Sequence, residues 1–353
     1  MLVMLAAFCL KGQEGAFLTM EVRCGDEVKR PAIVYTPVSV SKKARTPLLV
    51  YMHGAISNPK LKADPLAYMQ RSSLVGLAEE GAFRLMFVYG QKGAGWFDAV
   101  GSEMVMDAVE MAKKKFAVDT DRVFLSGFSD GGSGTIYLAM TEPEAFAGFI
   151  AMNGHLRVAT KIGSCQLYPE NMNQKPFLMI NTRGDVLYPS RSMGPMADAL
   201  KAVNPYFTFR DLEGSHSMEY LEAEKARILQ FISENQRKTL AEMSWETSDI
   251  RSGGLDWLKI TGLDTLAAPA KWHMPPKLTL FEDKAVWGMK FDYAFEGPGL
   301  KVKGFASDTS TAERIGVIIG DVVMMMEKDS MKNPYSPYFY VAKKKAGDPC
   351  AVQ

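Results

Sequence analysis

Residues 123–140 read VFLSGFSDGGSGTIYLAM, the most informative stretch of the chain. Residues 123–126 form a short apolar run that is typical of a buried strand, and residues 132–140 are predicted to form a helix. Between them, glycines stand two residues on either side of Ser129, where they relieve the clashes of a sharply bent backbone. We therefore expect a strand, a tight turn that presents Ser129, and a helix. A glycine-rich turn with an incidental serine is the alternative.

Seven further strands are predicted around this turn. Residues 17–22 and 32–35 flank the Cys24-Gly25-Asp26 turn and are expected to pair as a hairpin. Most of the others are continuous apolar runs, as is typical of strands that are buried on both faces of a sheet. These runs are residues 47–52, 85–89, 148–152, 177–181 and 206–211.

Helical patterns separate the strands. Apolar residues share one face of a helix near the middle of this region and of another that closes it. The two sets are Met104, Val105, Ala108, Val109 and Ala112, and Tyr220, Leu221, Ile228, Phe231 and Ile232. Strands that alternate with helices after an N-terminal hairpin predict an α/β fold with a doubly wound, mostly parallel sheet.

The length of 353 residues favours two domains, and 47% hydrophobic with 23% charged residues is typical of a folded protein. The net charge of +1 predicts no general attraction to nucleic acid or to anionic membranes. We place an α/β domain at residues 16–237, a connecting segment rich in Trp and Pro at 238–285, and a second small domain at 286–353. No transmembrane segment is predicted.

Residues 1–15 contain an apolar run from Leu2 to Leu10, which is too short to span a bilayer. It resembles the apolar core of a secretory signal, although it has no positive start and no small-residue cleavage site. We interpret residues 1–15 as the remnant of an export signal, which predicts a secreted or periplasmic protein. A frayed N-terminal segment is the alternative.

No metal site or cofactor is predicted. The four cysteines are widely spaced and form no C-x-x-C pair, which argues against a zinc site. One or two disulfides are compatible with this spacing, but the spacing does not show which cysteines would pair. The cysteines are Cys9, Cys24, Cys165 and Cys350.

A serine hydroxyl becomes a good nucleophile only when a base accepts its proton, and the chain has four histidines. In doubly wound sheets that present a serine at such a turn, the catalytic groups follow along the chain in the order serine, acid, histidine, which excludes His53 as the base. His155 leaves no room for a strand that carries the acid before it, and His273 lies outside the α/β region. His216, between the last predicted strand and the final helix, is therefore the predicted base.

The acid is expected after the strand at residues 177–181. Asp185 stands there beside Gly184, which permits a tight turn. Its carboxylate would hold the imidazole tautomer and stabilise the imidazolium. An ordinary turn aspartate is the alternative, and Asp198 and Asp211 are weaker candidates for the acid.

The developing oxyanion needs hydrogen-bond donors. The backbone N–H of Asp130 is predicted to be one and that of Ala55 the other, with Gly54 allowing the backbone to approach closely. His53 is interpreted as a structural residue of that loop. Trp96, on a glycine-rich loop, is predicted to wall the substrate pocket, and a tryptophan that covers the core edge is the alternative.

These motifs resemble one group of α/β-hydrolases, the polyhydroxybutyrate depolymerases and feruloyl esterases. The resemblance rests on residues 118–132 around Ser129 and on residues 51–55, and it covers roughly residues 15–235. It implies hydrolysis of a carboxylic ester, small or derived from a polymer, outside the cytoplasm. The group often has Asn or Met where Asp130 stands. Prolyl-oligopeptidase-like peptidases share the serine turn, so a serine peptidase stays an alternative.

The second domain is similar to a PDZ domain. Residues 297–302 resemble its carboxylate-binding loop and first strand, and residues 311–323 resemble the bacterial helix–turn–strand signature. The resemblance implies that Gly299 and Leu300 bind a peptide C-terminus by strand addition, in a unit expected to be truncated or minimal. A PDZ-led adaptor whose hydrolase fold only binds is the third alternative for the function.

Overall fold

The computed structural model describes residues 15–56, 61, 63–91, 93–164, 166–173, 175–247, 249–250, 253–263, 287–292, 294–306, 310–332, 336–341, 344 and 347–353. Residues 1–14 of the predicted export signal, Cys9, Cys165 and His273 lie outside these ranges. Cys24, which is buried, and Cys350, which is exposed, are free thiols. None of the helices in the described ranges is long and apolar enough to cross a membrane.

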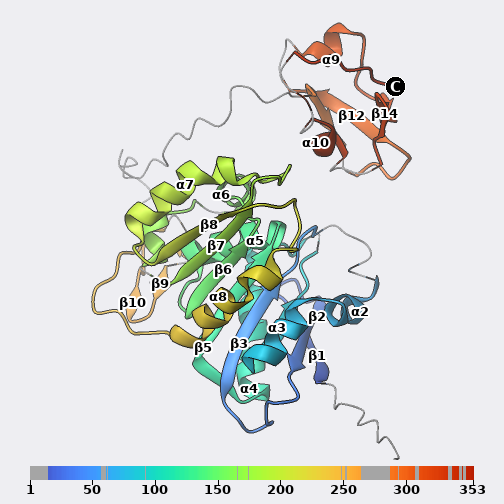
Figure 1. The fold of residues 1–353 in the computed structure, drawn as a ribbon. Coiled ribbons are helices and arrows are strands. Elements are labelled where there is room, and N and C mark those ends of the chain that lie inside the picture. The colour runs from blue at the N-terminus through green and yellow to red at the C-terminus, as the bar shows by residue number, and fades with distance from the viewer. Residues whose placement is uncertain are drawn as a thin grey trace, which may run out of the picture.

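An eight-stranded sheet forms the centre of the first domain, in the order β1-β2-β4-β3-β5-β6-β7-β8 (Figure 1). The pairs β1–β2 and β2–β4 are antiparallel, and the other neighbours are parallel. The predicted hairpin and mostly parallel sheet are therefore confirmed. The strands are β1 Ala16–Arg23, β2 Lys29–Thr36, β3 Thr46–Met52, β4 Arg84–Val88, β5 Val118–Phe128, β6 Gly148–Met152, β7 Phe177–Thr182 and β8 Phe207–Leu212.

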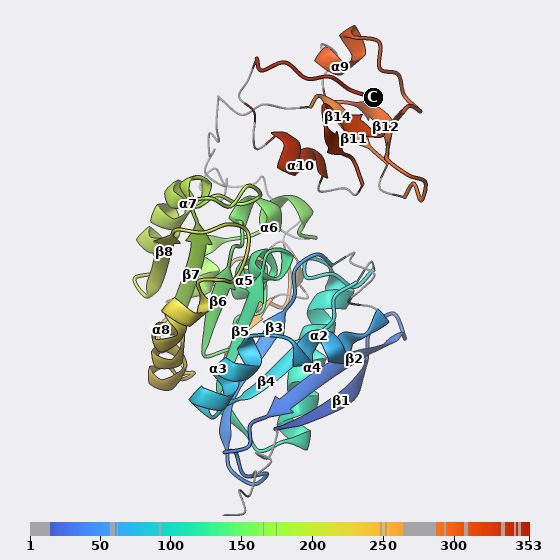
Figure 2. The same ribbon diagram turned by 45° about the vertical axis from the view of Figure 1, so that its right-hand side comes forward.

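Helices cover both faces of this sheet, because its strands send apolar side chains to each side. In β3, for example, Leu48 and Val50 belong to one apolar cluster, whereas Leu49 and Tyr51 belong to the other. Helices α4, α5, α6 and α7 pack on the first side, and α2, α3 and α8 pack on the second (Figure 2). Their bounds are α2 Pro65–Gln70, α3 Leu74–Gly81, α4 Ala99–Lys115, α5 Asp130–Thr141, α6 Leu156–Ile162, α7 Ser190–Val203 and α8 Leu221–Glu234.

The chain after α8 packs back on the α/β domain through two asparagine side chains that flank the end of a short 3-10 helix, Pro169–Met172. The Asn171 amide donates to the carbonyl of Glu246 at 2.7 Å and accepts from its N–H at 2.8 Å. Asn173 makes the same pair of bonds with Ser244, at 2.6 and 2.8 Å. Each amide thus acts as a peptide group would in a strand, and together they anchor this part of the connecting segment.

Further apolar burial accompanies this anchor. Trp245 and Leu255 are both buried. Leu255 belongs to a small hairpin of β9, Gly254–Leu255, and β10, Leu258–Lys259. In contrast, Trp257 is 62% exposed. The connecting segment is therefore attached to the first domain at residues 244–246. The predicted domain boundaries stay predictions.

The C-terminal part has an apolar cluster of its own, which includes Phe291, Val302 and Tyr340. It contains a three-stranded sheet in the order β11-β12-β13, a β14–β15 pair and two short helices. The elements are β11 Met289–Phe291, β12 Leu300–Phe305, α9 Thr311–Arg314, β13 Val322–Val323, β14 Met325–Met326, β15 Asp329–Ser330 and α10 Ser336–Val341.

The predicted addition of a peptide strand at Gly299 and Leu300 does not fit this sheet. Leu300 is buried and pairs with Val323 of β13. On its other side β12 pairs with β11, and the carbonyl of Lys301 accepts from the N–H of Asp292 at 2.8 Å. In the described residues β12 has a neighbouring strand on each side, so Leu300 lies on no free edge to which a peptide strand could add.

The two described tryptophans of the connecting segment give a matched test of its packing. Trp245→Ala should lower the free energy of unfolding by roughly 3 kcal/mol, because it empties a buried site. Trp257→Ala should cost less than about 1 kcal/mol, because that ring is mostly exposed. Urea unfolding of the full chain measures both. Equal costs would show that the segment does not pack on the domain as described.

Candidate active site

Ser129 lies at the sharp turn between β5 and α5, with φ of 58° and ψ of −115°. This conformation is costly for a residue with a side chain, and it persists only where the surroundings enforce it. A Cβ on Gly131 would lie 2.0 Å from the carbonyl oxygen of Met52, and one on Gly127 would lie 2.2 Å from that of Gly131. Glycine is therefore required on both sides of the serine, as the sequence motif predicts.

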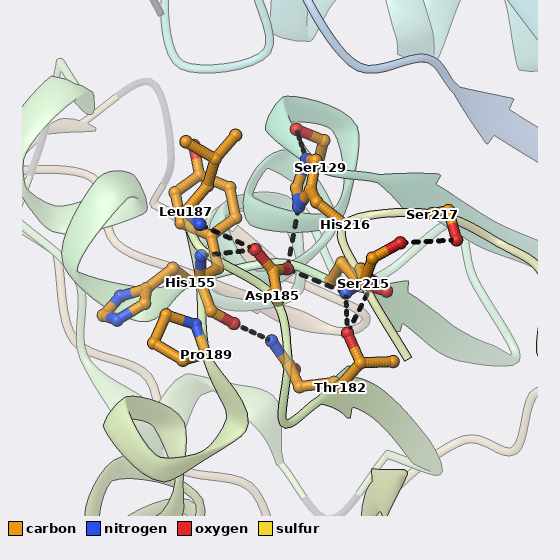
Figure 3. Close-up of polar contacts among 12 residues, drawn as sticks. Ser129, His155, Thr182, Asp185, Leu187, Pro189, Ser215, His216 and Ser217 are labelled. Atoms are coloured by element: carbon orange, nitrogen blue, oxygen red, sulfur yellow. Dashed lines mark hydrogen bonds and ion pairs between the residues drawn. The ribbon is translucent and has the colours of Figure 1, made fainter. Parts of the chain in front are cut away.

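The structure brings Ser129, His216 and Asp185 together (Figure 3). The His216 Nε2 is 2.8 Å from the Ser129 Oγ, and its Nδ1 is 2.7 Å from the Asp185 Oδ2. The three residues follow β5, β8 and β7, and the carboxyl ends of these parallel strands meet at one edge of the sheet. With Nδ1–H donated to the carboxylate, Nε2 is free to accept the serine proton.

Asp185 is 2% exposed, yet hydrogen bonds satisfy both of its carboxylate oxygens. Oδ1 accepts from the backbone N–H groups of Leu187 and Tyr188, both at 2.8 Å. Oδ2 accepts from His216 and from the side-chain amide of Asn153 at 2.8 Å. Burial alone would raise the pKa of Asp185. The hydrogen bond from His216, the charge of that imidazole and the other donors outweigh burial and lower the pKa below its usual value. The carboxyl is therefore held ionised.

Two aromatic rings flank the His216 imidazole. The ring centroid of Phe128 is 5.0 Å from that of the imidazole, and the centroid of Tyr188 is 5.5 Å away in an edge-on arrangement. The imidazole side chain keeps 14% of its surface exposed. The rings thus restrict its rotation while leaving a route for a substrate or a water molecule.

The predicted oxyanion donors belong to the serine turn and to the loop that packs against it. Asp130 is the first residue of α5, so its N–H has no acceptor within the helix. Ala55 has a φ of 50°, and the neighbouring loop runs so close that a Cβ on Gly54 would lie 2.8 Å from the Ser129 Cβ. Gly54 therefore allows the close approach expected of it.

The side chain of Asp130 is a part of the site that sequence reasoning missed. Its Oδ2 accepts from the N–H of Ile56 at 3.2 Å, in the same loop as Ala55. Burial raises the pKa of the Asp130 carboxyl above its usual value. It outweighs four groups that lower this pKa, namely the N–H groups of Ile56 and Ala55, the charge of His216 and the side chain of Tyr188. Only the unusual aspartate after the serine signalled it in the sequence.

Trp96 does not line a pocket, so that prediction is wrong. Its side chain is 0% exposed, and its Nε1–H donates to the carbonyl of His53 at 3.0 Å. The side chain fills the space beside Gly90 and Gly134, where a Cβ would come within 2.7 and 2.5 Å of its atoms. Trp96 therefore supports the loop that carries Gly54 from behind.

The two other described histidines have structural contacts. Burial lowers the pKa of His53, which keeps the ring neutral, and its Nδ1 lies 2.7 Å from the carbonyl oxygen of Gly54. His155 accepts at Nδ1 from the N–H of Arg157, and its Nε2 lies 3.0 Å from the Ser192 Oγ. Within the described ranges, no three His, Cys, Asp or Glu side chains gather as metal ligands would.

A sequence profile for phospholipases and carboxylesterases matches residues 35–235, more than half of the chain. The chain belongs to this family. Its α/β-hydrolase fold carries the serine turn, the acid loop and the histidine loop within the matched region.

Individual relatives are more distant. The bifunctional acetylxylan esterase/xylanase of Neocallimastix patriciarum is 28% identical over 124 residues, which are 34% of this chain and 17% of that protein. The chain thus spans less than a fifth of the length of this curated relative.

Among solved structures, a fungal esterase from Rhizomucor miehei is 14% identical with a TM-score of 0.52, over 64% of this chain and 84% of that one. A ferulic acid esterase is 17% identical with a TM-score of 0.47, over 62% of this chain and 98% of that one. At these identities the likeness to the Rhizomucor esterase shows the fold alone.

The raised pKa of Asp130 predicts a pH-dependent stability difference. The native state holds the Asp130 proton more tightly than the unfolded state does, so the wild type loses stability as the pH rises through the interval from the ordinary aspartate pKa to the raised one. Asp130→Asn cannot ionise. The melting temperature of this variant minus that of the wild type should therefore increase across that interval and stay constant above it.

Thermal unfolding of both proteins at a series of pH values measures this difference. Asp119→Asn, at a partly exposed position of β5, is the control for a change of charge. A difference between wild type and Asp130→Asn that does not change with pH would contradict the raised pKa.

Proposed function

We propose that the protein hydrolyses carboxylic esters through an acyl-enzyme on Ser129. The observation that carries the proposal is the His216 imidazole, which is within hydrogen-bond reach of the Ser129 Oγ and of the buried Asp185 carboxylate at once. Membership of the phospholipase/carboxylesterase family supports ester hydrolysis as the class of reaction. The residues in their individual roles are our assignment.

In the first half of the reaction, the Ser129 Oγ attacks the carbonyl carbon while His216 Nε2 takes the hydroxyl proton. The negative charge moves to the carbonyl oxygen, where we assign the N–H groups of Ala55 and Asp130 as donors. Each such donor lowers the barrier by on the order of 3 kcal/mol. When the tetrahedral intermediate collapses, His216 returns the proton to the leaving alcohol, and the acyl group stays on Ser129.

In the second half, a water molecule takes the place of the alcohol. His216 accepts a proton from this water as its oxygen attacks the acyl carbon, and the proton then returns to the Ser129 Oγ as the acid leaves. Asp185 stays ionised and stabilises the imidazolium in both halves. The chain's own residues supply every proton transfer, and this cycle calls for no metal or cofactor.

The substrate we propose is a small or polymer-derived ester. The acetylxylan esterase relative acts, by its name, on acetyl groups of a polysaccharide, which supports a short acyl group. The narrower resemblance to polyhydroxybutyrate depolymerases and feruloyl esterases supports an ester derived from a polymer. A secreted or periplasmic location belongs to the same proposal and rests on the apolar run at residues 2–10.

Removal of the Ser129 hydroxyl tests the proposed nucleophile. Ser129→Ala should abolish both hydrolysis of p-nitrophenyl acetate and labelling by a fluorophosphonate probe, while circular dichroism shows an intact fold. The nearby Ser126 and Ser133 are buried, and their hydroxyls donate to the carbonyls of Val50 and Ser129. Ser133→Ala should therefore stay labelled. Labelling that persists in Ser129→Ala would contradict the assignment.

A substrate panel separates the esterase from its two alternatives. We expect turnover of acetyl esters, no cleavage of matched anilides or of proline-containing peptides at the same enzyme concentration, and no effect of EDTA. Faster cleavage of peptides than of esters would favour the peptidase. A well-folded wild type that neither turns over any substrate nor reacts with fluorophosphonate would favour the adaptor.

A further inference from the structure

A buried side-chain network behind the imidazole connects the loop of the acid to the loop of the base. Its centre is Asn153, directly after β6, with no exposed surface. The Asn153 Nδ2 donates to the Asp185 Oδ2 and to the Thr182 Oγ1, both at 2.8 Å. Its Oδ1 accepts from the Tyr220 hydroxyl at 2.7 Å. One amide therefore contacts the acid, the end of β7 and the start of α8.

Thr182 carries the network to the base. Its hydroxyl donates to the carbonyl oxygen of Ser215 at 2.7 Å, and Ser215 directly precedes His216. The backbones of the two loops also pair, from the Gly184 N–H to the Gly214 carbonyl at 2.9 Å. Hydrogen bonds thus lead from Asn153 to the carboxylate and, through Thr182, to the loop that carries the imidazole.

The direction of every bond in the network is determined by chemistry. The ionised Asp185 can only accept, and Thr182 uses its one proton for the Ser215 carbonyl, so both must receive a proton from Asn153. The amide nitrogen consequently faces these two groups, and its oxygen faces the hydroxyl of Tyr220. A network in which every group is satisfied in only one arrangement is rigid.

The backbone at Asn153 also favours this residue type. Its φ of 44° lies in the left-handed region, which asparagine adopts more readily than most residues with a side chain. Glycine would suit the backbone but lacks the amide. Aspartate would fit the space, but it would bring a second carboxylate against Asp185, and two such carboxylates do not ionise together.

We propose that Asn153, Thr182 and Tyr220 are positioning residues that hold Asp185 and His216 in the relative positions that proton transfer requires. None of the three touches the Ser129 hydroxyl, so they act through the acid and the base. This inference rests on the proposed function, because the relative positions of Asp185 and His216 matter for catalysis only if His216 accepts the proton of Ser129.

The test compares two substitutions at Thr182. Thr182→Val keeps the shape of the side chain and removes both hydrogen bonds, whereas Thr182→Ser keeps them. We expect Thr182→Val to lower kcat for p-nitrophenyl acetate on the order of tenfold or more, with KM little changed, because small misplacements of reacting groups are costly. Thr182→Ser should restore most of the lost kcat. Asn153→Asp should lower kcat further, and Tyr220→Phe less.

Thr141→Val is the matched control for the loss of a buried threonine hydroxyl. The Thr141 hydroxyl donates to the carbonyl of Tyr137 at 3.1 Å, on α5 and outside the network. This variant should lose stability and keep the wild-type kcat. A second readout is the far-downfield proton NMR signal of the His216 Nδ1–H, which should shift or broaden in Thr182→Val and stay unchanged in Thr141→Val.

The outcomes separate this inference from the proposed function. If Thr182→Val keeps wild-type kcat and NMR signal, or if Thr141→Val loses as much kcat at equal loss of stability, the network does not position the acid and base. A wild type without esterase activity would instead overturn the proposed function, and the NMR signals would still report whether the network holds the pair.

Discussion

The architecture of this protein depends on one strained residue, Ser129. Its backbone conformation places the hydroxyl above the end of the central strand, where no ordinary strand or helix position would present it. The close contacts that a Cβ would meet at Gly54 and Gly131 show how little space surrounds the turn. The buried sheet supplies the rigidity that keeps the turn in this conformation, and the two helical layers exclude water from the faces of the sheet.

Electrostatics complement this geometry, because the charge of His216 acts on two aspartates, Asp185 and Asp130, whose environments differ. Asp185 receives four hydrogen bonds from His216, Asn153 and two backbone N–H groups, which lower its pKa despite burial. At the partly buried Asp130, desolvation outweighs the hydrogen bonds to the carboxylate, and its pKa is raised. Environments that separate the pKa values of neighbouring groups are typical of sites that move protons. This difference supports a division of roles in which Asp185 stabilises positive charge on His216.

The sheet and the three residues that meet at its edge were predictable from the sequence, because their signals are local. Continuous apolar runs indicate buried parallel strands, and parallel strands bring their ends together whatever the detailed packing. Asp185 and His216 could thus be paired with Ser129 from their places after strands. The roles of Trp96 and Asn153 depend on contacts between segments far apart in the sequence, and no local pattern distinguishes a wall of a pocket from a support behind a loop. The occupied edges of β12 are likewise a property of the assembled sheet, which the similarity of residues 297–302 to a binding loop does not reveal.

The central claim is that an ester leaves its acyl group on Ser129. The most direct measurement is rapid acid quenching of the protein during turnover of p-nitrophenyl acetate, followed by intact-mass and peptide mass spectrometry. Our account predicts a burst of p-nitrophenol approaching one equivalent per chain, with a single acetyl group on the peptide that contains Ser129. Acetyl groups on another residue during the burst, or steady hydrolysis with no acylated protein at any quench time, would contradict it.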